Sequence, residues 1–600
     1  MEAGLVQKEQ MPFPAILSTY MPKYDIRWSG TPTVDSRLGP AMDQGLLTCW
    51  GRVQTYPNMK ARRKVDYTGV VEQPRFFNTP NFDDANAYLN TSPNYSAAVL
   101  GVLKYAKPEP SLTDDDSQAL SMAKDWLYLE FRDAFEKSEI IDLDTSVSHF
   151  DMSTSPGYPY STLYRDKREF LDDGGMEELH MFDQNLLDLP TPCCVWTSSL
   201  KEELRKVSKI RDNKIRQFTG APCTYVAALN RYTLRQNEAL YTLHTTTASA
   251  VGMSPFYGGW NKLFQKLARF KNGYVGDFEE YDSSLFRRLL AAQADVRWRG
   301  ICVTNLALGC DALSTHRQRF YKLTKEEIHA LMKLVCGLMM QKHLGNPSGT
   351  PNTTTNNTFV LFLLLCMYWI TNKLGSYSQF KLWVRAALYG DDNTFTVACE
   401  IVHAFNGAGF ERYCNGIGLT LHVNHEPLAP SSLEFLSCGF AVKNGIAYMK
   451  PLKLEKFRAG LLCRDDGRPS TRLSRVCAYQ MLLFGAYFVD PHGEAGKLYE
   501  DLRLEEARLL KRYDPLLEDD ASWLAAKCQR CSDVDLLRLH VPYEARTLAL
   551  KEDECNSKNV TYVEEIAKQV WQKYERWGQR WQREGHATGS RCSCTSIREG

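Results

Sequence analysis

The chain has almost no net charge, no low-complexity tract and no long linker rich in proline, glycine or serine. Its 72 lysine and arginine residues balance 71 aspartate and glutamate residues, which leaves a formal net charge of +1. The field of the whole molecule therefore attracts no polyanion, and a surface that binds one must concentrate its basic side chains locally. Because no linker interrupts the 600 residues, several subdomains that pack as one body are expected.

Two kinds of apolar segment are also missing. The first residues lack the apolar run of a signal peptide, so secretion is not expected. The longest apolar stretch, residues 359–370, is too short to span a bilayer; it predicts a buried helix and no transmembrane segment. The 18 cysteines are then expected to be reduced thiols.

A zinc site near the C-terminus is only weakly indicated. A CxxC pair and loosely spaced downstream partners supply the candidate ligands: Cys528, Cys531, His586, Cys592 and Cys594. A zinc site needs four converging ligands, and a single CxxC with irregular partners favours ordinary thiols.

The pattern of apolar residues predicts strands in the centre and helices in the last third. Residues 112–137 have a helical pattern that begins with Thr113 and a run of aspartates, the residue types preferred at a helix N-terminus. Two short β-rich runs, 381–388 and 393–397, flank a tight polar turn and predict a hairpin. After about residue 449 the amphipathic spacing of helices returns.

The turn of the predicted hairpin is Tyr389-Gly390-Asp391-Asp392. Adjacent carboxylates raise each other's pKa, so two consecutive aspartates are normally unfavourable. A bound divalent cation removes this conflict, and a tight turn presents both carboxylates at its tip. The alternative is an ordinary solvated turn, because exposed turns rich in aspartate are common.

A second acidic segment, residues 273–285, strengthens the metal interpretation. Asp277 follows a short β-like run, and Asp282 comes five residues later. If Asp277 ends a strand beside the Asp391 hairpin, three carboxylates can surround two metal ions. Two ions about 3.5–4 Å apart serve an in-line phosphoryl transfer. Asp277 alone would be an ordinary strand-end aspartate, but its pairing with Asp391 favours a metal site.

Residues 345–365 combine a polar loop with an apolar helix. Ser348 and Gly349 form a flexible loop whose amides can approach a phosphate closely. The run from Thr353 to Asn357 places hydroxyl and amide groups at the start of the helix. These groups predict a hydrogen-bonding surface for ribose hydroxyls. An N-capped helix with a polar first turn is the alternative.

The densest basic cluster lies in residues 198–222. Its side chains recur at a spacing of two to four residues: Lys201, Arg205, Lys209, Arg211, Lys214 and Arg216. A solvated helix face is the usual meaning of such a run. In a chain with no net charge, the cluster instead favours a clamp for an entering triphosphate.

Taken in chain order, the four segments resemble motifs of RNA-dependent RNA polymerases of positive-strand RNA viruses. The basic segment resembles the fingers motif, the acidic segment 273–285 the palm strand, the loop 345–365 the palm loop and the Asp391-Asp392 turn the palm hairpin. Residues 152–161 are similar to the template-channel motif of picornavirus-like enzymes. Residues 433–440 resemble the hairpin that grips the primer strand, and residues 251–267 resemble the segment before the first palm motif of potyvirus and astrovirus polymerases. The matches span about residues 150–440 and are together highly specific.

The resemblance implies an α+β fold, a closed right hand of fingers, palm and thumb with an antiparallel palm sheet and a helical thumb. The implied boundaries place fingertips and fingers at 1–270, the first part of the palm at 271–300 and more of the fingers at 301–345. The rest of the palm would cover 346–448 and the thumb 449–600.

The resemblance also implies the roles of individual residues. Asp277 and Asp391 would bind both metal ions, Mg²⁺ or Mn²⁺ as its substitute, with Asp392 in support. Asp282 and Asn357 would read the ribose 2′-hydroxyl.

The other nucleotide contacts implied by the family fall into three groups. Thr353 would help in reading the ribose. Ser348 and Gly349 would form a mobile loop that lets the template translocate. The nucleotide channel would be lined by the basic residues Lys201, Arg205, Lys214 and Arg216, with Arg216 at the triphosphate.

One departure from the family pattern concerns the proton donor. The fourth palm motif commonly carries a lysine proposed to protonate the pyrophosphate leaving group, and residues 400–428 contain none. His422 or His425 can donate a proton at neutral pH, whereas Arg412 can offer only charge. The general acid is therefore left open.

The implied activity is transfer of nucleotidyl groups from ribonucleoside triphosphates to the 3′-hydroxyl of a growing RNA, directed by an RNA template, for viral genome replication and transcription. A reverse transcriptase is the nearest rival, but it has a bulky aromatic residue where this chain has Asp282. An RNA-binding scaffold with a decayed palm would have lost a metal carboxylate, and all are present.

The family also implies partners and a location. Besides an RNA template and primer, other viral replication proteins are expected, at membrane-associated complexes in the host cytoplasm. The sequence leaves open whether synthesis begins on a protein primer or de novo.

Overall fold

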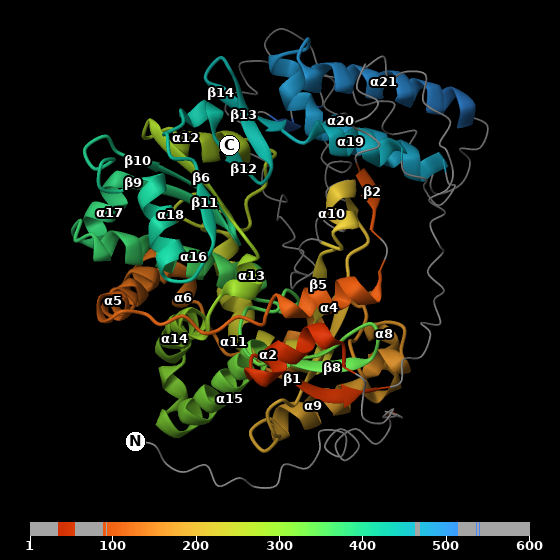
Figure 1. The fold of residues 1–600 in the computed structure, drawn as a ribbon, viewed down its shortest axis with the longest axis vertical. Helices are drawn as coiled ribbons and strands as arrows, with labels where there is room; N and C mark the ends of the chain where they lie inside the picture. Colours follow the sequence, from red (N-terminus) through yellow and green to blue (C-terminus); the bar gives the residue numbers. More distant parts are fainter. Residues whose placement is uncertain are drawn as a thin grey trace, which may run out of the picture.

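The computed structural model describes residue 24, residues 34–53, 88–91, 93–462 and 469–513, and residues 536, 539 and 540. In this part of the chain the strands form four separate sheets, and helices surround them (Figure 1). One pair of neighbouring strands is parallel and the others are antiparallel. Mostly antiparallel sheets with segregated helices confirm the predicted α+β class.

The central sheet has four antiparallel strands in the order β11-β6-β10-β9. Its strands are β6 (Asn272–Phe278), β9 (Val384–Tyr389), β10 (Asp392–Val397) and β11 (Leu421–Val423). The strands β9 and β10 form the predicted hairpin, in which Tyr389 lies opposite Asp392. The antiparallel sheet expected for a palm is therefore present.

The predicted start of the first hairpin strand was wrong. Residues 381–383 end helix α17 (Tyr377–Trp383) instead of forming part of β9. The helix begins with a capping box in which the side chains of Ser376 and Gln379 satisfy each other's backbone amides. Phe380 is buried in the core, so the segment gains from staying helical until Val384.

Three helices pack against the central sheet and form its core: α5 (Asp114–Glu130), α14 (Arg287–Thr304) and α16 (Thr353–Thr371). Thr113 caps α5 in a capping box with Asp116, as the sequence predicted. Among the described residues, α16 is the one helix long and apolar enough to cross a membrane, but 89% of its apolar window is buried inside the protein. Its position confirms the buried helix expected for residues 359–370.

A five-stranded sheet joins distant parts of the sequence in the order β1-β8-β7-β3-β5. Its strands are β1 (Leu47–Arg52), β3 (Val195–Leu200), β5 (Gln217–Gly220), β7 (Leu331–Lys333) and β8 (Leu338–Lys342). Two helices, α11 (Cys223–Tyr241) and α15 (Cys310–Ile328), pack with this sheet. Their Tyr232 and Phe320 lie in the same hydrophobic core as Trp196 of β3.

The last described segments pack around a second core. A three-stranded sheet comprises β12 (Glu434–Phe435), β13 (Cys438–Lys443) and β14 (Ile446–Pro451). Three helices follow it: α19 (Leu454–Leu462), α20 (Pro469–Val489) and α21 (Glu494–Tyr513). The core joins Phe440 and Phe484 to Trp260 of helix α12 (Gly259–Leu267). The described part of the C-terminal third is helical, as predicted.

A two-stranded sheet links the N-terminal part of the chain to these helices. It consists of β2 (Tyr88–Asn90) and β4 (Leu204–Lys206), and β4 leads into helix α10 (Val207–Arg211). The Tyr88 hydroxyl donates a hydrogen bond to Glu455 Oε1 of α19 at 2.8 Å. Figure 1 shows β2 and α10 reaching toward α19 on the side of the molecule away from the central sheet. This hydrogen bond joins the two-stranded sheet to helix α19.

The remaining described helices complete the layers around the sheets. They are α2 (Gly39–Asp43), α4 (Tyr95–Leu103), α6 (Arg132–Phe135), α7 (Leu143–Ser148), α8 (Lys167–Phe170), α9 (Met176–Asn185), α13 (Tyr281–Ser284) and α18 (Gly407–Gly416).

Candidate active site

The register of the central sheet places Asp277 beside the acidic hairpin. Asp277 stands near the end of β6, the strand that pairs with β10 on one side and with β11 on the other. Asn393 of β10 lies opposite Gly276, so the neighbouring Asp392 and Asp391 continue past the end of the ladder next to Asp277. The side chain of Asp277 is exposed.

The hairpin turn is fixed to the core. Gly390 has φ +65°, the left-handed conformation that glycine adopts without strain. Its amide donates a 2.9 Å hydrogen bond to Thr358 Oγ1 on the buried helix α16. The turn thus holds Asp391 at its tip, where the side chain remains open to solvent.

The three carboxylates influence one another's protonation. The protein around Asp391 reduces its hydration and raises its pKa, and the charge of Asp277 adds to the effect. Reduced hydration and the charge of Asp391 raise the pKa of Asp392 to about 7, although its Oδ2 accepts a 3.0 Å hydrogen bond from the Leu436 amide. Three mutually repelling carboxylates form the donor set that a hard divalent cation prefers.

The predicted ribose-reading residues are in contact. Asn357 Nδ2 donates a 2.5 Å hydrogen bond to Asp282 Oδ1. Burial and the charge of Asp391 raise the pKa of Asp282 to about 6, while the hydrogen bond from Asn357 and the charge of Lys201 lower it. The structure therefore brings Asp282 within electrostatic reach of the acidic hairpin.

Thr353 and the loop before it are already engaged within the protein. The buried Thr353 hydroxyl is within hydrogen-bonding distance of the carbonyl oxygens of Pro347, at 2.9 Å, and Thr350, at 3.1 Å. Ser348 Oγ accepts a 3.2 Å hydrogen bond from the Thr219 amide of β5. The loop is thereby packed against the strand that follows the basic cluster.

Gly349 makes the closest approach in this loop. A Cβ atom at this position would lie 1.6 Å from the carbonyl oxygen of Thr219, which no side chain allows. The Gly349 carbonyl also accepts a 3.4 Å hydrogen bond from the Ala221 amide. A residue with a side chain here would force the two backbones apart.

The basic cluster is built from strands and one short helix, so it is not a single solvated helix face. Its residues follow β3, run through β4 and α10 and end at β5. Arg216 Nε donates a 2.7 Å hydrogen bond to Glu203 Oε1, and Arg205 lies 3.8 Å from the same atom. The charge of Arg216 lowers the pKa of Asp391, which places its guanidinium within reach of the hairpin. Lys214 is exposed, with Asp212 as its ion-pair partner at 4.0 Å.

The three candidate proton donors lie at different places. His422 of β11 is opposite Asp277 in the β11–β6 register, and its Nε2 is 3.1 Å from Glu279 Oε1. His425 Nε2 is 3.4 Å from Glu411 Oε2, and Arg412 is exposed on α18. Directly opposite residues of antiparallel strands point to the same face of a sheet. His422 therefore shares the face of Asp277.

The family model for viral RNA-dependent RNA polymerases matches residues 65–491. The chain belongs to this family. The resemblance of its motifs to polymerase motifs is thereby confirmed.

Curated relatives of the polymerase are viral genome polyproteins. One, from Tobacco vein mottling virus, is 27% identical over 412 residues, which cover 66% of this chain and 13% of the polyprotein. Genome polyprotein 1 of Barley mild mosaic virus is 30% identical over 274 residues, which cover 45% of this chain and 11% of the polyprotein. The polymerase thus spans a small fraction of the relatives that it matches.

The polymerase also shares its fold with a solved structure. The Sicinivirus 3Dpol RNA dependent RNA polymerase superimposes with a TM-score of 0.57 at 15% sequence identity. The match covers 71% of this chain and 88% of the other. The predicted right-hand polymerase fold is confirmed by this similarity.

Sequence reasoning missed residues that orient the pair Asp282 and Asn357. Asn346 Nδ2 donates a 2.8 Å hydrogen bond to Asn357 Oδ1, which turns the amide nitrogen of Asn357 toward Asp282. Buried Lys342 donates to the carbonyl oxygens of Glu327, Ile328, Leu344 and Gly345 and so anchors the chain that leads to Asn346. The polar loop 345–349 was visible in the sequence, but the partners of these side chains were not.

Arg297 was also missed, because its partners come from distant segments. It is 1% exposed, and burial lowers its pKa to about 9. Its guanidinium donates hydrogen bonds to Asn356 at 3.0 Å and Thr355 at 2.6 Å in α16, and to Asn237 at 3.1 Å in α11. This network fixes the polar first turn of α16 from behind.

The weakly indicated zinc ligands lie outside the described residues. They are Cys528, Cys531, His586, Cys592 and Cys594. The same holds for the ends of the predicted fingers and thumb segments, and the proposed subdomain boundaries stay predictions.

Proposed function

We propose that this chain copies an RNA template, adding ribonucleotides from their triphosphates to the 3′-hydroxyl of a growing strand during viral genome replication and transcription. The observation that carries the proposal is the register of the central sheet. In this register Asp277 of β6 lies next to the Asp391-Asp392 turn, and the charge of Asp391 acts on Asp282, the hydrogen-bond partner of Asn357. Family membership supports the same activity.

Asp277, Asp391 and Asp392 are proposed to hold two Mg²⁺ ions, with Mn²⁺ as a substitute. The donor set fits: besides reduced hydration, the charge of Asp277 raises the pKa of Asp391, and the charges of Asp391 and Asp277 raise the pKa of Asp392. Bound ions would supply the positive charge that activates the attacking hydroxyl and stabilises the leaving pyrophosphate. Asp392 would act in support, because the Leu436 amide already occupies its Oδ2.

The basic cluster is proposed to position the triphosphate. Arg216 and Lys201 affect the pKa values of Asp391 and Asp282, respectively, which supports a place beside the reacting groups. Arg205 and Lys214 would line the approach. Glu203 would hold Arg216 in place until phosphate oxygens compete for its guanidinium.

Sugar selection is assigned to Asp282 and Asn357. A ribose 2′-hydroxyl can donate to the carboxylate of Asp282 and accept from the amide of Asn357. Thr353 would shape the adjacent loop, in which Ser348 and Gly349 shift as the template advances. A reverse transcriptase would not gain from such a pair, because it must exclude the hydroxyl that the pair reads.

His422 is proposed as the proton donor to the leaving pyrophosphate. Its place opposite Asp277 favours it over the other two candidates. His425 is instead beside the Glu411 carboxylate, and Arg412 is exposed on α18. A neutral-pH acid at this position would replace the lysine that the family commonly uses.

The proposed partners are an RNA template and primer, other viral replication proteins and, if synthesis does not begin de novo, a protein primer. The proposed location is a membrane-associated replication complex in the host cytoplasm. Identifying the 5′-end of the product, peptide-linked or triphosphate, would decide how synthesis begins.

The decisive experiment measures incorporation of a labelled ribonucleotide on a primed homopolymer RNA with Mg²⁺ or Mn²⁺. Wild-type protein should extend the primer, and Asp391→Asn should not. Incorporation by neither protein would favour an RNA-binding scaffold. Preferential incorporation of deoxynucleotides would favour a reverse transcriptase.

A further inference from the structure

A second set of metal-binding side chains lies beside the five-stranded sheet. Cys193 and Cys194 directly precede β3, and Glu326 lies near the end of α15, which leads to β7. The strands β3 and β7 are parallel neighbours with Val195 opposite Leu331. The residues just before the two strands therefore meet, although they are far apart in the sequence.

The spacing of the three side chains suits a tetrahedral metal ion. The Sγ atoms of Cys193 and Cys194 are 3.9 Å apart, and one ligand atom from each of the three residues lies within 4.8 Å of the others. Two thiolates bound to one tetrahedral zinc ion through bonds of about 2.3 Å are separated by roughly 3.8 Å. A disulfide would bring the sulfur atoms to about 2.05 Å. The observed separation fits two thiolates that share a cation.

The Glu326 carboxylate has one oxygen to spare. Its Oε2 accepts hydrogen bonds from the amides of Cys193, at 3.0 Å, and Cys194, at 3.3 Å. Its Oε1 is buried and has no hydrogen-bond partner among the described residues, and the whole residue is 0% exposed. Burial also raises the pKa of Glu326 to about 7. A buried carboxylate oxygen normally has a hydrogen-bond partner or binds a cation, and two thiols beside it are further metal-binding groups.

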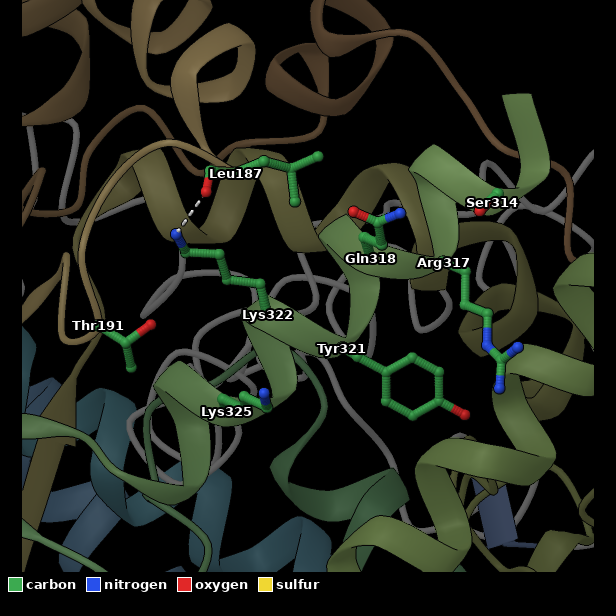
Figure 2. Close-up of a pocket in the computed structure, with 8 residues that line it drawn as sticks. All are labelled: Leu187, Thr191, Ser314, Arg317, Gln318, Tyr321, Lys322 and Lys325. Carbon is green, nitrogen blue, oxygen red and sulfur yellow. Dashed lines mark hydrogen bonds between the residues drawn. The ribbon is translucent and has the colours of Figure 1, made fainter. Parts of the chain in front are cut away.

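Lys322 does not fill this role. The hydrogen bond with Cys194 and burial raise the pKa of Cys193, and burial raises the pKa of Cys194 and of Glu326. The charge of Lys322 is near enough to oppose all three shifts. Figure 2 shows that its ammonium group points to the Leu187 carbonyl, to which it donates at 3.3 Å; it also donates to the Leu189 carbonyl. Lys322 thus offsets negative charge at the cluster from outside its ligand shell.

We propose that Cys193, Cys194 and Glu326 bind a thiophilic divalent cation, with zinc as the natural ion and a water molecule as the fourth ligand, in a site that ties β3 to α15. Soft thiolates prefer zinc to magnesium, so the site is chemically distinct from the three aspartates of the central sheet. Reduced thiols, as expected from the sequence, would be available to bind it. Two thiolates and a carboxylate leave a charge of −1 on the zinc complex, which Lys322 balances.

A pocket of about 480 Å³ includes in its lining Thr191 and Lys325, near neighbours of Cys193 and Glu326 in the sequence. Arg317 and Lys322 also line it, and Figure 2 draws these side chains. Three positive side chains oppose the passage of a cation through this pocket. Zinc is therefore expected to be taken up as the protein folds and to be retained afterwards.

The test measures the zinc content of tag-free protein produced with added zinc and dialysed against EDTA under reducing conditions. The background carries Cys528→Ser, Cys531→Ser, Cys592→Ser and Cys594→Ser, which removes the cysteines of the other candidate zinc site. In this background, about one zinc ion per chain is expected by elemental mass spectrometry. Adding Cys193→Ser and Cys194→Ser, or Glu326→Gln, should lower zinc content at least fivefold.

The matched control adds Cys223→Ser and Cys366→Ser, two buried cysteines outside the cluster. This control should keep its zinc. The proposal is overturned if the background protein holds no zinc, or if the cluster variants hold as much as the control. X-ray absorption at the zinc edge of the background protein tests the site without a cluster variant. Two sulfur ligands with oxygen ligands support it, and four sulfur ligands or none reject it.

Discussion

Asn357→Ala is the substitution that tests the site most directly, because Asn357 is the central member of a hydrogen-bonded chain. It donates to Asp282 at 2.5 Å and accepts from Asn346 at 2.8 Å, and its side chain is 4% exposed. Removing its side chain takes away the hydrogen-bond donor to the Asp282 carboxylate and leaves Asn346 with only a longer, 3.5 Å hydrogen bond to the Thr353 carbonyl. The variant should discriminate less between ribo- and deoxynucleotides, chiefly because ribonucleotide incorporation slows.

The size of the effect follows from the charge of the partner. A hydrogen bond to a charged group contributes about 1.5–3 kcal/mol. Since about 1.4 kcal/mol corresponds to a factor of ten, the ratio of ribo- to deoxynucleotide incorporation should fall roughly 10- to 150-fold.

The pH dependence of Asn357→Ala gives an independent check. Burial raises the pKa of Asp282 to about 6, and the hydrogen bond from Asn357 opposes this rise. Without that donor the pKa rises further, so the carboxylate is protonated at a higher pH than in the wild type. The variant should therefore lose sugar selectivity at a higher pH than the wild type, which should lose it near pH 6.

The assay is single-nucleotide extension of a primed RNA with ATP or dATP. It compares wild type, Asn357→Ala, Asp282→Ala and the double variant, whose cost should be less than the sum of the single costs because the two residues share a hydrogen bond. Asn372→Ala makes the same chemical change at the exposed end of α16 and should behave as wild type. Unchanged selectivity in both single variants would mean that the sugar is read elsewhere and would reopen the reverse-transcriptase alternative.

Four further outcomes are expected. Asp391→Asn should reduce nucleotide addition to less than a tenth of the wild-type rate with folding and RNA binding nearly intact; a higher residual rate would exclude Asp391 as a metal ligand. Arg216→Ala should raise KM for the nucleotide and lower kcat with little change in template affinity, and the reverse pattern would assign the basic cluster to the RNA channel. Because the pKa of Asp392 is raised to about 7, protons should compete with Mg²⁺ below neutral pH, so the Mg²⁺ concentration for half-maximal activity should rise as pH falls from 8 to 6; a constant requirement would contradict the role of Asp392. His422→Gln should lower kcat more than His425→Gln, and an equal or opposite effect would reject His422 as the proton donor.

The parts of the site that the sequence predicted are those with a local signal. Two consecutive aspartates in a turn between strands are unusual without a cation, and the structure has that turn between β9 and β10. The acidic cap of α5 and the apolar run of α16 are likewise local patterns. Each could be predicted because a few neighbouring residues determine it.

The parts that the sequence did not reveal depend on contacts between distant segments. Arg297 gives no sign in the sequence that it supports α16, since its partners in that helix lie 58 and 59 residues away. Lys342 could be taken for a surface lysine, yet it is 0% exposed and bound to four backbone carbonyls. The helix at residues 381–383 differs from these two cases, because the capping pair Ser376 and Gln379 that begins it is a local signal in the sequence.

The close approach of Gly349 to Thr219 makes two elements of the site behave as one mechanical part. The loop that precedes the ribose-reading helix touches the strand that follows the basic cluster, backbone against backbone, with no side chain between them to absorb a displacement. A step of the loop must therefore move β5, or else break the hydrogen bonds that join them. Advance of the template and release of the triphosphate by the basic cluster would then occur at the same time. Gly349→Ala, which adds a single methyl group, would be enough to uncouple the two movements.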